Sequence, residues 1–267
     1  MNELLLAALV GLVVGTVMGS LGGGGGIISV PALVYLLDQP PLEATTTSLV
    51  VVGVTAIVGA LQYGRAGLVN VTDALAFGVL SIVGAVVGAR MALVVDGNVL
   101  MALFAVLLVA VAWLMWSRQR GQQVEDDVAR HWLQLRPFHL DRRRATQVAL
   151  AATGIGWLTG FFGVGGGFAI VPALMLLLGL PMRRAVGTSL LVLAITSLVG
   201  LATRVTGPVE LDWPLIIAFT VTAVLSSLAA GRLSARVSPG RLSRAFAVFL
   251  VLVAIYTAVN SIQGLLA

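Results

Sequence analysis

Two clusters of glycines are the residues whose type and spacing point most directly to chemistry. One cluster covers residues 22–26 and the other 163–167, and each precedes a short apolar segment. Because glycine has no Cβ, such a run interrupts a helix and lets the backbone approach a ligand closely. The helix that restarts after each cluster points free N–H groups and the positive end of its dipole into the break, which suits an anion. We therefore predict a substrate site for a small anion at Gly22, Gly24, Gly25, Gly26, Gly163, Gly165, Gly166 and Gly167.

A threonine–serine pair follows each glycine cluster at the same spacing. These pairs, in the first turns of the next apolar segments, are Thr47-Ser48 and Thr188-Ser189. Hydroxyls in such positions bond the oxygens of an anion, cap the helix or bond a neighbouring helix. We include all four residues in the predicted substrate-binding site, and the capping alternative stays open.

Close helix packing is the other use that the sequence suggests for its glycines. Gly11, Gly15 and Gly19 in the first half, and Gly156 and Gly160 in the second, follow the small-xxx-small spacing of helix interfaces in membranes. The same explanation remains open for the two glycine clusters.

Titratable groups are missing where an enzyme would need them. Both histidines, His131 and His139, lie in the polar middle of the chain, and no Asp, Glu or Lys falls in the centre of an apolar segment. The sequence therefore predicts no catalytic residues, metal site or cofactor. We expect Arg90, Arg204 and Arg232, near the ends of apolar segments, to extend their guanidinium groups to the membrane surface.

The elements that must position these residues are membrane helices. The chain has 267 residues, 59% hydrophobic and 10% charged, with no cysteine and a mean hydropathy of +1.05. A water-soluble fold carries about 25% charged residues. We therefore predict an all-α polytopic membrane protein with apolar segments at approximately 4–21, 27–37, 43–62, 73–95, 99–116, 145–162, 168–180, 185–203, 213–231 and 245–263.

The two halves of the chain are copies of each other. Residues 22–53, moved by 141 positions onto 163–194, give sixteen identities in thirty-two positions, including both Val-Pro-Ala-Leu runs. This duplication predicts a first membrane repeat over residues 1–117, a linker over 118–144 and a second membrane repeat over 145–267.

The basic residues, all of them arginine, orient the two repeats. Seven of the sixteen lie at 118–144, so the positive-inside rule makes the linker cytoplasmic. In one topology, the first two segments of each half cross the membrane and return, or fold back as a re-entrant hairpin. Fourteen arginines then face the cytoplasm. Both termini are then extracytoplasmic and the repeats are inverted, as in secondary transporters. This distribution also explains the net charge of +5 without nucleic-acid binding.

The duplicated element Gly-x-Gly-Gly-Gly-x-x-x-x-Val-Pro-Ala-Leu, followed by Ala-x-x-Thr-Ser-Leu, resembles the sulfite exporter TauE/SafE family. The resemblance spans the whole chain and implies a bacterial-type inner-membrane carrier for small sulfur-containing anions, such as sulfite or organosulfonates. The halves differ within the element, since Gly23 and Thr46 stand where the second half has Val164 and Gly187. The two halves therefore need not contribute equally to a site.

These observations predict a secondary transporter that exports a sulfur oxyanion by alternating access and has the lipid bilayer and this anion as its partners. A passive anion channel would use the same helix ends and stays an alternative. An intramembrane enzyme is a weaker alternative, because the apolar segments supply so few titratable groups.

Overall fold

The structure is a computed structural model that describes residues 3–22, 25–119, 142–163, 167–204 and 211–234, together with 248, 251, 252 and 255. All regular elements in these ranges are α-helices. They are α1 (Glu3–Leu21), α2 (Gly25–Tyr35), α3 (Pro41–Arg65), α4 (Val71–Ala92), α5 (Gly97–Gln119), α6 (Arg142–Phe162), α7 (Gly167–Leu177), α8 (Met182–Arg204) and α9 (Trp213–Ser234).

Five of these helices, namely α1, α3, α4, α8 and α9, are long and apolar enough to cross a membrane. Large apolar side chains also cover the outside of the molecule: Leu61, Val83 and Leu225 are each about 60% exposed or more, as expected where the solvent is lipid. The prediction of an all-α polytopic membrane protein is confirmed.

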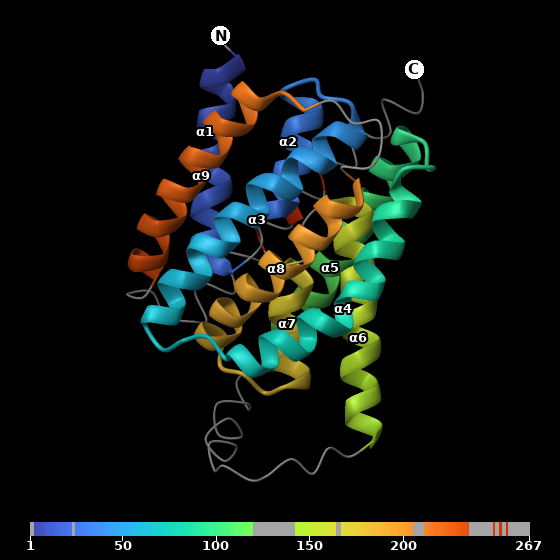
Figure 1. Ribbon diagram of the computed structural model, residues 1–267, viewed down its shortest axis with the longest axis vertical. Coiled ribbons are helices and arrows are strands. Elements are labelled where there is room, and N and C mark those ends of the chain that lie inside the picture. Colours follow the sequence, from blue (N-terminus) through green and yellow to red (C-terminus); the bar gives the residue numbers. More distant parts are fainter. Residues whose placement is uncertain are drawn as a thin grey trace.

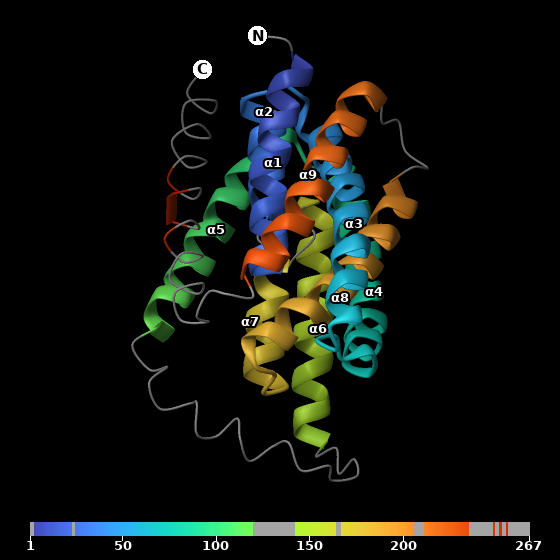
Figure 2. The same ribbon diagram turned by 90° about the vertical axis from the view of Figure 1, so that its left-hand side faces the viewer.

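The helices α2 and α7 are much shorter than their neighbours. Each has 11 residues, a length of about 16 Å, which is half of the hydrocarbon core. In Figures 1 and 2, α1 starts at the end of the molecule that holds the N-terminus and α2 returns toward that end, whereas α6 starts at the opposite end and α7 returns toward it. Two helical hairpins therefore enter the molecule from opposite ends.

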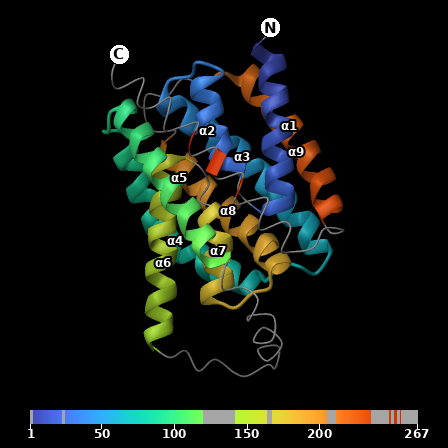
Figure 3. The same ribbon diagram turned by 180° about the vertical axis from the view of Figure 1, so that it is seen from behind.

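Helix packing follows the duplication. Helix α1 packs on α9, and the counterpart pair, α6 on α4, packs in the same way; α3 packs on its own counterpart α8. Figure 3 shows the two outer pairs on either side of the molecule, with α3 and α8 between them. This exchange of partners is what a two-fold relation between the halves produces. Their inverted orientation across a bilayer stays a prediction.

Small residues make the outer helix pairs tight. A Cβ on Gly11, Gly15 or Gly19 of α1 would run into backbone carbonyls of α9, and one on Gly156 or Gly160 would run into carbonyls of α4. The predicted packing role of these five glycines is confirmed.

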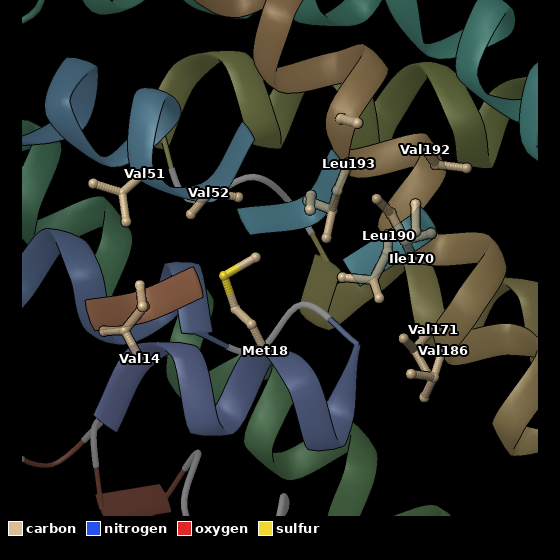
Figure 4. Close-up of a cluster of buried hydrophobic side chains, with 14 of the residues drawn as sticks. Val14, Met18, Val51, Val52, Ile170, Val171, Val186, Leu190, Val192 and Leu193 are labelled. Atoms are coloured by element: carbon tan, nitrogen blue, oxygen red, sulfur yellow. The ribbon is translucent and has the colours of Figure 1, made fainter. Parts of the chain in front are cut away.

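The apolar core lies where the two halves meet. Figure 4 shows Val14 and Met18 of α1 with Val52 of α3, Ile170 of α7 and Leu190 of α8, all of them fully buried. Side chains from both repeats fill this core together. Neither repeat therefore buries its apolar surface by itself.

The boundaries of the predicted linker stay a prediction. Helix α5 continues to Gln119 and α6 begins at Arg142, so both reach into the range 118–144. Residues 120–141 between them, and most of the predicted last segment, 245–263, lie outside the described residues.

Candidate functional site

Both helices that precede the glycine clusters end in the same way. Gly22 after α1 has φ +75° and Gly163 after α6 has φ +64°, a left-handed conformation that residues with a Cβ rarely adopt. The N–H of Gly22 donates to Met18 O at 2.9 Å, and the N–H of Gly163 donates to Thr159 O at 3.0 Å. These bonds form the usual left-handed helix cap, and the predicted helix breaks are confirmed at both places.

Each break packs against a helix of the other half. A Cβ on Gly22 would lie 2.7 Å from Val186 Cα in α8, and one on Gly163 would run into Thr45 O in α3. A Cβ on Gly25 would run into Met18 of α1. The close backbone approach that we predicted therefore brings Gly22, Gly25 and Gly163 against protein atoms.

The described candidate residues form two groups. The first is Gly22, Gly25 and Gly26 with Ser189, which bonds Gly22 O, and its neighbour Thr188; the second is Gly163 and Gly167, beside the turn of α3 that begins at Thr45 and carries Thr47 and Ser48. The remaining candidates, Gly24, Gly165 and Gly166, lie outside the described residues.

The two groups lie at opposite ends of the antiparallel pair α3–α8. A Cβ on Gly187, near the start of α8, would lie 3.0 Å from Tyr63 Cβ near the end of α3, and one on Gly200 would lie 3.3 Å from Leu49. Residues 45 and 63 of α3 are about 27 Å apart along the helix axis. The structure thus places the described candidate residues at two separate places, which we name the Gly22 half-site and the Gly163 half-site after their breaks; that they bind a substrate stays a prediction.

In the Gly22 half-site, the hydroxyls of Ser189 and Thr188 are bonded to other groups of the protein. Ser189 Oγ lies 2.6 Å from Gly22 O and 2.8 Å from Val186 O, so its hydroxyl donates to a protein carbonyl. Thr188 Oγ1 accepts from the N–H of Asn70 at 3.0 Å. Both hydroxyls are used between helices, which is the alternative that the sequence left open.

The same two residue types are unpartnered in the Gly163 half-site. Thr47 and Ser48 are 1% and 0% exposed, and neither hydroxyl has a hydrogen-bond partner among the described residues. Buried polar groups in proteins are nearly always bonded, so two adjacent exceptions need an explanation.

Arg204 is the residue of this half-site that the sequence did not reveal. We expected it to reach the membrane surface, and this expectation is wrong: Arg204 is 0% exposed and is the only charged side chain among the buried residues that the structure describes. It also has no carboxylate partner there. Because it ends an apolar segment, its position alone suggested a solvated group.

Most donors of the Arg204 guanidinium are bonded to protein. Nη1 donates to Thr45 Oγ1 at 2.5 Å and to Thr46 Oγ1 at 3.3 Å. Nη2 donates to Gly160 O at 2.6 Å and to Phe161 O at 3.0 Å, in the last turn of α6. Nε has no partner among the described residues. One N–H of a buried cation is therefore left to bond something else.

The duplication contains a signal that would have found this residue. Arg204 stands 141 positions after Tyr63, and the threonines that it bonds, Thr45 and Thr46, stand where the second half has Val186 and Gly187. The repeats therefore differ at the three positions that hold the charge and its hydroxyl partners.

Comparison with known proteins shows the family of this chain. The family model of the sulfite exporter TauE/SafE matches residues 7–257. A probable membrane transporter protein of Xylella fastidiosa is 33% identical over 262 residues, which cover 96% of this chain and 95% of that protein. The probable membrane transporter protein YunE of Bacillus subtilis is 28% identical over 73% of this chain and 76% of its own, and MJ0441 of Methanocaldococcus jannaschii, also named a probable membrane transporter protein, is 27% identical over 89% and 88%. No solved structure matches. The chain is a membrane transporter and belongs to the sulfite exporter TauE/SafE family.

Proposed function

We propose that this transporter exports a small sulfur-containing oxyanion, sulfite or an organosulfonate, across the bacterial-type cytoplasmic membrane by alternating access. The observation that carries the proposal is Arg204, a fully buried positive charge without a carboxylate partner in the described part of the chain. A buried charge is stable only when it is paired, and an anionic substrate can supply the missing pair. The family description, sulfite exporter, narrows the anion to a sulfur oxyanion.

The architecture supports alternating access. Two helical hairpins enter from opposite ends, and each packs against helices of the other half. Helix α1 packs on α9 and its break touches α8, whereas α6 packs on α4 and its break touches α3. Rocking one half against the other would open and close the two half-sites in turn, as in transporters built from inverted repeats.

The proposed topology places the central linker in the cytoplasm and both termini outside. It follows from the arginines, and the exposed Arg65 at the end of α3 and Arg183 and Arg184 at the start of α8 fit a cytoplasmic surface. With a negative interior, moving one negative charge outward gains about 2.3 kcal/mol per 100 mV. Export of an anion therefore needs no coupling carboxylate.

Flux of sulfite in liposomes tests this proposal. We would reconstitute the purified protein, set the membrane potential with a potassium gradient and valinomycin, and follow sulfite in protein-containing and protein-free vesicles. A carrier gives saturable flux and counterflow, whereas a passive anion channel shows neither. If sulfite shows no flux but an organosulfonate does, the substrate is an organosulfonate. If no sulfur oxyanion shows flux, the proposal is refuted.

A further inference from the structure

We propose that the anion binds at one of the two half-sites only, the Gly163 half-site, through Arg204 Nε and the hydroxyls of Ser48 and Thr47. This inference rests on the proposed function and adds to it where the charge of the substrate is held. The Gly22 half-site has the same fold but takes no direct part in holding the charge.

Contacts place two of these groups, Arg204 and Ser48, beside the break at Gly163, and Thr47 is the neighbour of Ser48 in the same turn of α3. Gly163 packs on the backbone of Thr45, and Thr45 accepts a hydrogen bond from Arg204. Ser48 lies one helical turn beyond Thr45 on the same face of α3. Its counterpart Ser189 touches the carbonyl of the other break, Gly22. The equivalence of the halves therefore puts Ser48 beside Gly163.

The chemistry of these groups selects an oxyanion. Four of the five guanidinium N–H donors of Arg204 are taken by Thr45, Thr46 and two carbonyls of α6, which leaves the Nε–H. Arg204 Nε and the hydroxyls of Ser48 and Thr47 are thus three donors without a partner among the described residues, two of them in the turn of α3 that begins at the Arg204 partner Thr45. An oxyanion such as sulfite offers only acceptors, so it satisfies all three and neutralises the charge.

The Gly22 half-site has the opposite properties. Tyr63 stands in place of Arg204, and its neutral hydroxyl donates to Gly19 O at 2.9 Å. Ser189 and Thr188 are bonded to protein groups as well. The hydroxyl of Ser189 is donated to protein carbonyls, Thr188 Oγ1 accepts from a backbone N–H, and no buried charge lies among the described residues there.

The proposed topology relates the difference between the two half-sites to the two sides of the membrane. With the linker in the cytoplasm, α8 begins on the cytoplasmic side, and Arg204 at its end lies toward the extracytoplasmic side. The charged half-site is then the one from which an exported anion leaves.

A purely structural role is the competing explanation for Arg204, because it donates to two carbonyls that end α6. The unpartnered hydroxyls separate the two explanations. Removing them costs no hydrogen bond among the described residues, so the variants Ser48→Ala and Thr47→Val should unfold at the same temperature as the wild type or higher. Weaker sulfite binding at unchanged stability then points to a contact with the ligand.

Equilibrium binding of radiolabelled sulfite to the purified full-length protein in detergent tests the inference. We expect Arg204→Gln to weaken binding by about tenfold to a hundredfold, and Ser48→Ala and Thr47→Val by about threefold to tenfold each. The controls are Tyr63→Phe, the equivalent change in the other half, and Ser81→Ala, a buried serine of α4 whose hydroxyl donates to Gly78 O. Both controls should keep the wild-type Kd within about twofold.

The outcomes distinguish this inference from the proposed function. Wild-type Kd in Ser48→Ala and Thr47→Val, or an equal loss in Tyr63→Phe, would overturn the one-sided site and leave a sulfite-binding transporter intact. If Arg204→Gln fails to fold, the sulfite affinities of Ser48→Ala and Thr47→Val still test whether the anion binds at the Gly163 half-site. Absence of both sulfite binding and sulfite flux in the wild type would overturn the proposed function and, with it, this inference.

Discussion

Arg204 and Tyr63 occupy equivalent positions in the two halves of the chain, and each donates a hydrogen bond to the carbonyl of an equivalent glycine, Gly160 or Gly19. The duplication has kept the geometry of this contact and changed its charge. Two similar helix breaks thus differ in electrostatics, because a buried charge lies at the Gly163 half-site and a neutral tyrosine at the Gly22 half-site.

Transport should require a positive charge at position 204. The chain has no cysteine, so Arg204→Cys introduces a single thiol. We expect this variant to lose most sulfite flux and to regain part of it after reaction, before reconstitution, with a methanethiosulfonate reagent that carries a positive charge. A negatively charged reagent of similar size should restore nothing. Equal recovery with both reagents would contradict a role for the charge.

The serines of the two half-sites should differ in their effect on stability. Ser189→Ala removes a hydroxyl bonded to Gly22 O, so we expect a loss of about 1 kcal/mol in stability. Ser48→Ala removes an unpartnered hydroxyl and should be neutral or stabilising. Thermal unfolding of both variants in detergent measures the difference. Equal destabilisation would mean that Ser48 has a protein partner.

The caps of α1 and α6 should tolerate no side chain. Gly163→Ala combines a left-handed backbone with a collision at Thr45, so we expect a loss of about 2–4 kcal/mol, seen as a lower unfolding temperature and yield. Gly67→Ala is the matched control, because Gly67 has φ +68° but no atom within 4 Å of its Cβ position. Its cost should be backbone strain alone, about 1–2 kcal/mol. The same loss for both variants would show that contact with α3 is unimportant.

The contact between α4 and α6 should depend on one face of α6. A Cβ on Gly156 would run into the backbone of Ser81, whereas one on Gly154 meets nothing within 4 Å. We expect Gly156→Val to abolish accumulation of folded protein in the membrane and Gly154→Val to leave it unchanged. Size-exclusion chromatography of the detergent-solubilised variants measures both. A monodisperse Gly156→Val protein at wild-type yield would argue against this helix pair.

Sulfite export should respond to the membrane potential. Suppose that one net negative charge moves per cycle and that the side from which the anion leaves is held at a negative potential. A potential of 100 mV should then raise the equilibrium accumulation of sulfite on the other side by about fiftyfold. Sulfite flux into or out of vesicles held at several membrane potentials measures how steeply transport depends on the potential. A flux that ignores the potential would mean that the anion crosses together with a compensating cation or proton.

Much of the fold could be predicted from local sequence. Apolar segments of about twenty residues specify membrane helices because the backbone must satisfy its own hydrogen bonds in lipid, and the breaks at Gly22 and Gly163 follow from the conformational freedom of glycine. The duplication further predicted that helices would occur as equivalent pairs. The packing faces of α1 and α6 were visible as well, because small residues repeat every four positions on one side of a helix.

The electrostatics of the half-sites were decided only by tertiary structure. Arg204 ends an apolar segment, as an arginine that reaches the membrane surface does, and only the difference between the two repeats at this position sets it apart in the sequence. It is buried because α8 crosses α3 in antiparallel direction and brings it against Thr45, Thr46 and the end of α6. Likewise Ser48 and Ser189 both stand in a Thr-Ser-Leu run, and their surroundings on other helices determine that Ser189 is bonded whereas Ser48 has no partner among the described residues. The sequence by itself thus determined the helices, their breaks and their equivalence, whereas contacts between distant segments decided where the charge lies.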